Sequence, residues 1–298
     1  QTPDPPQGVI QRDDSGEPTG LLLEMNDYVS GRMGVHRERD RLLGLGKVNT
    51  LLLSQGITSV QDASHSNTTE RWHALCSAKK ERIFLPRLTF MPGIAHLDRF
   101  LEEGILSSHG DLDIHLGPAK VMLTTTTGEI QPSREVLQKQ VEGALRLGLS
   151  VAVHAVDTES IETALDVLEN TNCLNLFSTA RNRIEHCSEC PPRLVERLRI
   201  GGVTVVTQPG FLYHSGQRYL AQVPVERQPW LYPMGSLQHG GIHLAFSSDA
   251  PVTLPNPFIA LYAATTRRAK TGEVLLPQEA ITAEEALRSY TVGGAYAS

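Results

Sequence analysis

The sequence has no long apolar run and no excess of basic residues. No stretch approaches the roughly 18 consecutive apolar residues of a membrane span, so we expect no membrane partner. The net charge of −6 and the pI near 6.0 argue against nucleic acid as a partner. No signal-type segment leads the chain, and we expect a cytoplasmic protein. The hydrophobic share of 40% is enough for a sizeable globular core.

Cysteine is also scarce. The four cysteines, Cys76, Cys173, Cys187 and Cys190, are too few for a disulfide scaffold and fit a reduced protein. Cys187 and Cys190 form a single C-x-x-C, whereas a zinc ribbon needs a second such pair. We interpret them as two packed thiols and keep a structural or redox role as the alternative.

The apolar pattern alternates between strand and helix along the chain. Strands are expected at 56–62, 85–91, 117–123, 150–155, 182–187, 203–208 and 242–247. Helices are expected at 33–54, 67–80, 95–104, 133–148, 158–169, 191–200, 225–239, 256–269 and 282–297. Residues 1–32 are rich in turn residues and predict a hairpin or surface excursion. No repeat or linker divides the pattern, so we interpret residues 1–298 as one α/β domain.

Seven predicted strands are one fewer than the eight of a closed (β/α)8 barrel. An open doubly wound sheet is the alternative, but the functional residues of such a sheet usually lie at one crevice. Polar residues at the ends of four different strands favour a ring instead. We therefore expect a TIM-like barrel whose first strand lies upstream of Gln1, in a chain that is a processed product or part of a longer protein.

Four residues at predicted strand ends are candidates for a metal site: Lys120, His154, His186 and Asp249. In a parallel barrel the carboxyl ends of the strands meet at one rim, which holds the active site. Two neutral imidazoles, a lysine and a carboxylate there suggest a divalent cation that activates water. We expect His154, His186 and Asp249 to converge within reach of one ion.

Each candidate also has a purely structural interpretation. A strand-end histidine can be hydrogen-bonded packing, and Lys120 can be one half of a buried ion pair. Asp249 can cap the entry of the next helix. Strand alternation places Ile184 on the inner face with His186, and therefore predicts that Arg183 and Glu185 point outward.

On the same alternation, Ala152 shares the inner face with His154. A charge at Glu185 needs a partner, so we treat this residue as structural, paired with Arg183 or with a helix residue.

The segment 208–219 follows a strand and should lie on the same rim. Tyr213, His214 and Arg218 make it a candidate substrate wall or lid, with an ordinary surface loop as the alternative. The run from Thr124 to Gly128 has no phosphate-loop spacing, so nucleotide binding is not supported. The chain also has no Gly-x-Ser-x-Gly elbow, which argues against a serine hydrolase.

Taken together and in order, several motifs resemble the amidohydrolase superfamily, in particular its branch that contains N-substituted formamide deformylase. They are Gly56-Ile-Thr-Ser-Val-Gln-Asp-Ala63, His154-Ala-Val, Arg183-Ile-Glu-His186, Gln208-Pro, Ser248-Asp-Ala-Pro251 and Tyr290-Thr-Val-Gly-Gly-Ala-Tyr296, with Gly16-Glu-Pro-Thr-Gly20 near the start. The resemblance covers essentially the whole chain. It implies a metal-dependent barrel that hydrolyses amide or other C–N bonds.

The resemblance also implies roles for the strand-end residues. Lys120, carboxylated in many members, would bridge two metals on the fourth strand, and His154 and His186 would be ligands on the fifth and sixth. Asp249 would be a ligand and the catalytic base on the eighth. The family's first-strand His-x-His and its small β domain have no counterpart in this chain, and Thr124–Gly128 stands where the branch has Asp-Gly.

With part of the ligand set missing, we expect this chain to hold at most one divalent ion, zinc before others, where the family holds one or two. The expected function is metal-dependent hydrolysis of an amide or formamide-type bond, although this fragment need not be active. The alternatives are a non-catalytic barrel that binds a small ligand and a deaminase of cyclic amidines or amines. The expected partners are a small-molecule substrate and, at most, a second copy in a homodimer.

Overall fold

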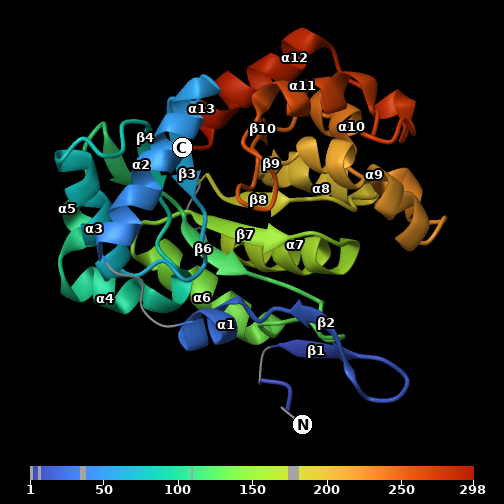
Figure 1. Cartoon of the computed structure of the whole chain (residues 1–298). Coiled ribbons are helices and arrows are strands. Elements are labelled where there is room, and N and C mark those ends of the chain that lie inside the picture. Colours follow the sequence, from blue (N-terminus) through green and yellow to red (C-terminus); the bar gives the residue numbers. More distant parts are fainter. Residues whose placement is uncertain (1–2, 6–7, 34–37, 109, 174–180) are drawn as a thin grey trace.

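The computed structural model describes residues 3–5, 8–33, 38–108, 110–173 and 181–298 (Figure 1). From residue 59 onward parallel strands alternate with helices, as the apolar pattern predicts, apart from two strands at 114–116 and 119–122 that follow one another directly. The strands are β1 (Val9–Arg12), β2 (Pro18–Leu23), β3 (Ser59–Asp62), β4 (Arg87–Phe90), β5 (Ile114–Leu116), β6 (Ala119–Met122), β7 (Val151–Ala155), β8 (Arg183–His186), β9 (Thr204–Thr207) and β10 (Leu244–Phe246).

The α-helices in the described part of the chain are α1 (Asn26–Met33), α2 (Glu38–Ser54), α3 (Thr69–Lys80), α4 (Leu97–Glu102), α5 (Ile105–Ser108), α6 (Arg134–Arg146), α7 (Thr158–Cys173), α8 (Pro192–Gly201), α9 (Gly210–Gln222), α10 (Met234–His239), α11 (Pro257–Thr266), α12 (Ala283–Arg288) and α13 (Gly294–Tyr296). Short 3-10 turns lie at η1 (Ile94–His96), η2 (Gln228–Trp230) and η3 (Pro277–Glu279), and a π turn at η4 (Ser289–Gly293). None of these described helices has the length and apolar character needed to cross a membrane.

The parallel strands form two sheets, in the orders β10-β9-β8-β7-β6 and β3-β4-β5. An isolated bridge between Gly93 and Lys120 joins them, with the Lys120 amide donating to the Pro92 carbonyl at 2.8 Å. Among the described strands β10 does not pair with β3, so closure of a ring is not detected. The expected strand upstream of Gln1 stays a prediction.

The strand expected at 117–123 is β6 (Ala119–Met122), and β5 (Ile114–Leu116) is an additional strand just before it that the sequence pattern did not predict. β5 pairs with β4, and β6 pairs with β7. The break falls at Gly117, where an added Cβ would lie 2.5 Å from a methyl carbon of Thr89. The chain therefore changes partners at a glycine that packs directly against β4.

The helical turns at the C-terminus contact both β10 and β3, the two strands that do not pair with each other. A Cβ on Gly293 would lie 2.2 Å from the Leu244 carbonyl oxygen on β10. Across the gap, Gln61 on β3 donates its side-chain amide to the Gly294 carbonyl at 3.1 Å. The segment from Ser289 to Ser298 thus connects β10 and β3, which do not pair with each other.

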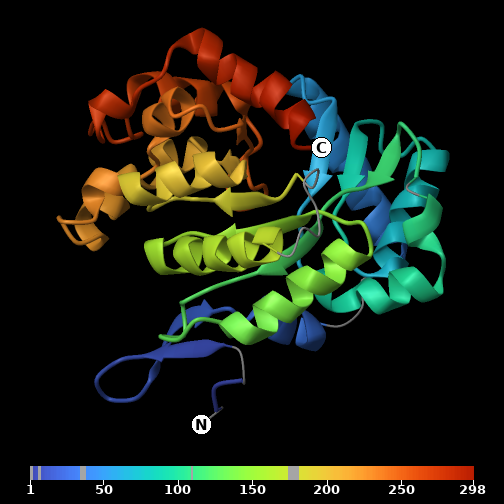
Figure 2. The same cartoon turned by 180° about the vertical axis from the view of Figure 1, so that it is seen from behind.

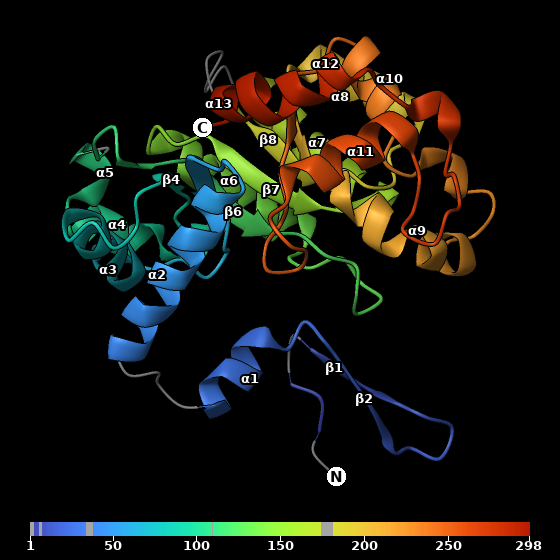
Figure 3. The ribbon, with the colours of Figure 1, turned by 45° about the horizontal axis from the view of Figure 1, so that its top comes forward.

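The N-terminal segment forms an antiparallel hairpin of β1 and β2 and then α1, set apart from the main body in Figure 3. Glu24, just after β2, accepts hydrogen bonds from Thr124 (3.4 Å) and Thr126 (3.1 Å) in the loop after β6. The hairpin is therefore attached at the carboxyl end of the sheet, beside the rim.

The main core lies between the sheet and its helices, which Figure 2 shows from behind. On α6, buried residues recur three or four positions apart, at Leu137, Val141 and Ala144, so one face packs on the sheet. The helix expected at 33–54 behaves differently. Of its residues α2 covers 38–54 and Met33 ends α1, while residues 34–37 lie outside the described part of the chain. Leu43 and Val48 on its apolar face are 57% and 45% exposed.

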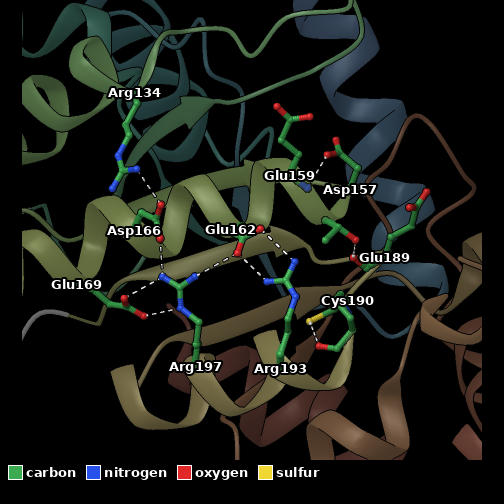
Figure 4. Close-up of polar contacts among 12 residues, drawn as sticks. Arg134, Asp157, Glu159, Glu162, Asp166, Glu169, Glu189, Cys190, Arg193 and Arg197 are labelled. Atoms are coloured by element: carbon green, nitrogen blue, oxygen red, sulfur yellow. Dashed lines mark hydrogen bonds and ion pairs between the residues drawn. The ribbon is translucent and has the colours of Figure 1, made fainter.

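Helices α7 and α8 are joined on the outside by a network of ion pairs (Figure 4). Arg197 on α8 donates to Asp166 at 2.7 Å and to Glu169 at 2.8–2.9 Å on α7, and Arg193 donates to Glu162 at 2.6 Å. These groups are partly or largely exposed, so solvent screens the network.

Candidate active site

Two histidine rings meet at the carboxyl ends of adjacent strands. His154 lies on β7 and His186 ends β8, and their ring centroids are 4.4 Å apart in an edge-to-face arrangement. Burial lowers the pKa of His186 and takes the pKa of His154 well below its usual value. The charges of His186 and Lys120 lower the His154 pKa further. Both imidazoles are therefore neutral near pH 7, each with one nitrogen lone pair.

The strand register shows that the predicted face of β8 was wrong. In the paired strands His154 aligns with Glu185, and Glu185 with Val206, so these side chains share the inner face. Ile184 aligns with Val153 and packs in the outer core under the helices. Arg183 and Glu185 therefore point inward, contrary to expectation.

His186 still reaches the site because its backbone leaves the β conformation. Its φ is +77°, in the left-handed region, and this ends the alternation of side chains along β8. The ring thus turns to the same side as His154.

The amide of Gln208 fixes the tautomer of His186. Gln208 donates through Nε2 to the Val206 carbonyl at 3.3 Å and to Ser247 Oγ at 2.9 Å. Since a carbonyl can only accept, Oε1 is the atom that faces His186 Nδ1, at 2.8 Å. The hydrogen-bond network therefore assigns the hydrogen to Nδ1 and leaves the lone pair on Nε2.

A buried ion pair lies below the histidines. Arg183 Nε is 2.6 Å from Glu185 Oε1, and both side chains are almost fully buried, which confirms the expected pairing. Arg183 also donates to Gln61 at 2.6 Å, to the Ala297 carbonyl and to the sulfur of Met91. One guanidinium thus connects β8, β3, the end of β4 and the C-terminal segment.

Lys120 points to the same inner face and is buried. Burial lowers its pKa to about 8, while the charge of Glu185 acts in the opposite direction. Among the described residues no carboxylate forms an ion pair with Lys120 within 4 Å, so the ion-pair alternative is not supported there. At neutral pH its amine is therefore still mostly charged, with a larger neutral fraction than an exposed lysine would have.

Asp249 follows β10 and is partly buried, with a φ of +54°. Asn256, and not Asp249, caps α11. Its side chain accepts hydrogen bonds from the amides of Phe258 and Ile259 at the start of that helix. Burial raises the pKa of Asp249, and the charges of His186 and Lys120 oppose that rise. The carboxyl group is thus available at the rim.

The two neutral imidazoles fit a divalent ion as a pair of nitrogen ligands. The described residues contain no group of three His, Cys, Asp or Glu side chains placed to hold a metal, so Asp249 does not complete a three-ligand set. Catalytic zinc sites use three protein ligands. The residues present thus account for part of a ligand set.

The rim segment 208–219 is a helix, not a loop, from residue 210 onward. Tyr213 is partly buried on α9, whereas His214 and Arg218 are exposed. The residue that faces the histidines is Phe211, whose ring lies parallel to His186 with centroids 6.4 Å apart. Nothing in the sequence pattern separates Phe211 from its aromatic neighbours.

Two further residues near the site were not predicted. His65, in the loop after β3, lies close enough to His154 to lower the pKa of that imidazole. A strand-end position could have indicated it, as it did for the chosen histidines. Tyr232 packs edge-to-face on Phe211, with ring centroids 6.5 Å apart, and burial raises its pKa well above the usual value.

Cys187 and Cys190 are free, buried thiols. A hydrogen bond with Cys190, together with burial, raises the pKa of Cys187 well above its usual value. Cys187 is therefore protonated and packed, in line with the favoured interpretation. Cys173 lies in the last turn of α7.

These features define an α/β protein with a polar site at the carboxyl ends of its parallel strands. The chain belongs to the amidohydrolase family, which matches it over residues 1–298. It is 28% identical to N-substituted formamide deformylase of Arthrobacter pascens over 330 residues, and 26% identical over 334 residues to the protein LONG AFTER FAR-RED 3 of Arabidopsis thaliana. Both matches cover 100% of this chain but only 59% and 56% of those proteins.

Among solved structures, an uncharacterized metal-dependent hydrolase from Pyrococcus horikoshii OT3 superposes with a TM-score of 0.78 at 24% identity. A second such hydrolase, from Pyrococcus furiosus, gives 0.77 at the same identity. These matches cover 96% of this chain and 61% and 62% of the other chains. The fold is therefore that of these hydrolases, and this chain spans about three-fifths of their length.

Proposed function

We propose that this chain supplies most of the active site of a metal-dependent hydrolase of an amide or formamide-type C–N bond. The supporting observation is the contact between the neutral rings of His154 and His186, with Asp249 on the same rim. Family membership and the match to N-substituted formamide deformylase favour hydrolysis of a C–N bond over other reactions.

The roles of the residues follow from their surroundings. His186 would bind a divalent ion through Nε2, since Gln208 holds the hydrogen on Nδ1, and His154 would be the second imidazole ligand. When bound, such an ion lowers the pKa of water toward about 7 and polarises a carbonyl oxygen. Zinc suits a site of imidazole nitrogens and carboxylate oxygens.

Asp249 would act first as the general base and then as the general acid. Water adds to the carbonyl carbon of the substrate while a carboxylate oxygen of Asp249 takes one of its protons. The same carboxyl then gives that proton to the nitrogen as the C–N bond breaks. A raised pKa suits this work, because the group must both accept and release a proton near neutral pH.

The test is a hydrolysis assay on the zinc-loaded protein with N-substituted formamides and N-acetyl amines, following release of the free amine. We expect Asp249→Asn to lower kcat by about 10²- to 10⁴-fold. The control is Asp157→Asn, at the end of β7, where the asparagine can still accept from the amides of Glu159 and Ser160.

Three results would overturn the proposal. Equal rates in the two variants would remove Asp249 from the reaction. Ammonia released from cyclic amidines, with no amide cleavage, would indicate a deaminase. Binding of the amides without turnover, with zinc present, would indicate a non-catalytic barrel.

A further inference from the structure

A pocket of about 410 Å³ lies between the two helices that follow β9 and β10. Helices α9 and α11 lie side by side in Figure 3 and form its walls, and the turn after α11 completes it. Its volume is within the range of small-molecule sites, which is roughly 300–1,000 Å³. No residue with a role in the proposed hydrolysis lines it.

One side of the pocket is aromatic. Tyr213 on α9 and Tyr262 on α11 meet edge-to-face, with ring centroids 6.1 Å apart. Phe258 lies one helical turn before Tyr262, on the same face of α11, and is 70% exposed. These three rings offer an apolar surface suited to another flat ring, because aromatic pairs gain energy beyond the area that they bury.

The other side of the pocket is positively charged. Arg268 and Lys270 stand on the turn after α11, where the Lys270 amide donates to the Tyr213 carbonyl at 2.8 Å and so ties this turn to α9. Arg268 donates to the Gly272 carbonyl at 3.0 Å, which leaves most of its guanidinium N–H groups for a ligand. Within the described residues neither side chain forms an ion pair with a carboxylate.

The two helices that form the pocket begin at the rim of the candidate site. Helix α9 begins right after Gln208, and Phe211 in its first turn stacks on His186. Helix α11 begins after the loop that carries Asp249. Both walls are thus helices that start just beyond site residues, next to the strand-to-helix loops that set substrate specificity in parallel barrels.

We propose that this pocket binds the non-reacting end of the substrate, an aromatic ring that carries a carboxylate. The rings of Tyr213, Phe258 and Tyr262 contact the ligand ring, and Arg268 and Lys270 bind its carboxylate. The inference rests on the proposed function for the reaction itself. It adds the substrate class, an amide or formamide whose far end is an aryl carboxylate.

The first test measures binding of phenylacetate to the metal-free 298-residue protein by calorimetry or ligand-observed NMR. We expect 2-phenylethanol, which keeps the ring and lacks the charge, to bind about tenfold more weakly or worse, since hydrogen bonds to charged groups contribute that much. The double variant Arg268→Gln/Lys270→Gln should lose phenylacetate binding by at least the same factor. Arg288→Gln, an exposed arginine on α12 outside the pocket, is the matched control and should bind normally.

A carboxylate could instead bind beside the buried amine of Lys120, so Lys120→Met is also measured. Loss of phenylacetate binding in Lys120→Met with full binding in the double variant overturns the inference. Equal affinity for phenylacetate and 2-phenylethanol also overturns it.

A second readout separates this inference from the proposed function. With an amide that the zinc-loaded protein hydrolyses and that ends in an aryl carboxylate, the double variant should raise KM about tenfold and leave kcat nearly unchanged. An unchanged KM refutes the pocket while hydrolysis stands. Phenylacetate binding that depends on Arg268 and Lys270, in a protein that hydrolyses nothing, upholds the pocket and refutes the reaction.

Discussion

Replacing Arg183 with methionine should destabilise the protein more than any comparable surface change. Its guanidinium pairs with Glu185 at 2.6 Å and donates to Gln61 at 2.6 Å and to the Ala297 carbonyl, all in the interior. Without it, the Glu185 carboxylate is buried with no direct partner. Lys120, whose pKa is lowered by Arg183, would become more fully charged and offset part of the loss.

Breaking a buried pair by removing one partner costs about 3–5 kcal/mol, and we expect the lower end because of Lys120. Arg193→Met is the matched control, because its contact with Glu162 is also 2.6 Å but the two side chains are 53% and 42% exposed. That variant should lose at most about 1 kcal/mol. Urea unfolding, analysed with a common m-value, gives the loss in the free energy of unfolding for each of the two variants.

The double variant Arg183→Met/Glu185→Gln completes the cycle. Its loss in the free energy of unfolding should be smaller than the sum of the losses in Arg183→Met and Glu185→Gln. The reason is that the double variant leaves neither member of the pair as a buried charge without its partner. If Arg183→Met unfolds at the same urea concentration as Arg193→Met, the buried pair does not hold these segments together and the reasoning fails.

Three other predictions concern the site and the surface. Gln208→Leu removes the acceptor for His186 Nδ1 and should weaken zinc binding about 10- to 100-fold in a competition titration, and an unchanged affinity would contradict the assigned tautomer. The free energy of unfolding should fall as the pH drops below about 6.5, by up to about 1.4 kcal/mol per pH unit, because the unfolded chain binds a proton that folded His154 excludes. His154→Asn should flatten that slope in urea titrations, and an identical slope would rule the imidazole out as its source. Arg197→Ala should destabilise the protein by about 1 kcal/mol at low salt and by less in 1 M NaCl, measured by thermal unfolding, and a loss independent of salt would argue against an ionic contribution.

Much of the strand and helix order could be predicted because each core element repeats its apolar residues at its own period. His154 and His186 were expected to meet because parallel strands bring their carboxyl ends together, and their rings are in contact. The pairing of Arg183 with Glu185 could likewise be predicted, because a buried charge needs a partner.

The features that the sequence did not predict depend on single backbone angles and long-range packing. The face of Glu185 was wrong because alternation stops at His186, and a left-handed φ at a histidine has no signature in the apolar pattern. The strand β5 was missed because it has only three residues and depends on its pairing with β4, which lies far from it in the sequence. Similarly, the stacking of Phe211 on His186 depends on where α9 begins.

The left-handed backbone at His186 and Asp249 implies a trade-off between activity and stability. A side chain in that conformation costs roughly 1–2 kcal/mol that glycine would not. His186→Gly would relax the backbone, but it would also remove the buried imidazole that Gln208 and Phe211 contact. The site therefore holds these two side chains at a cost in stability.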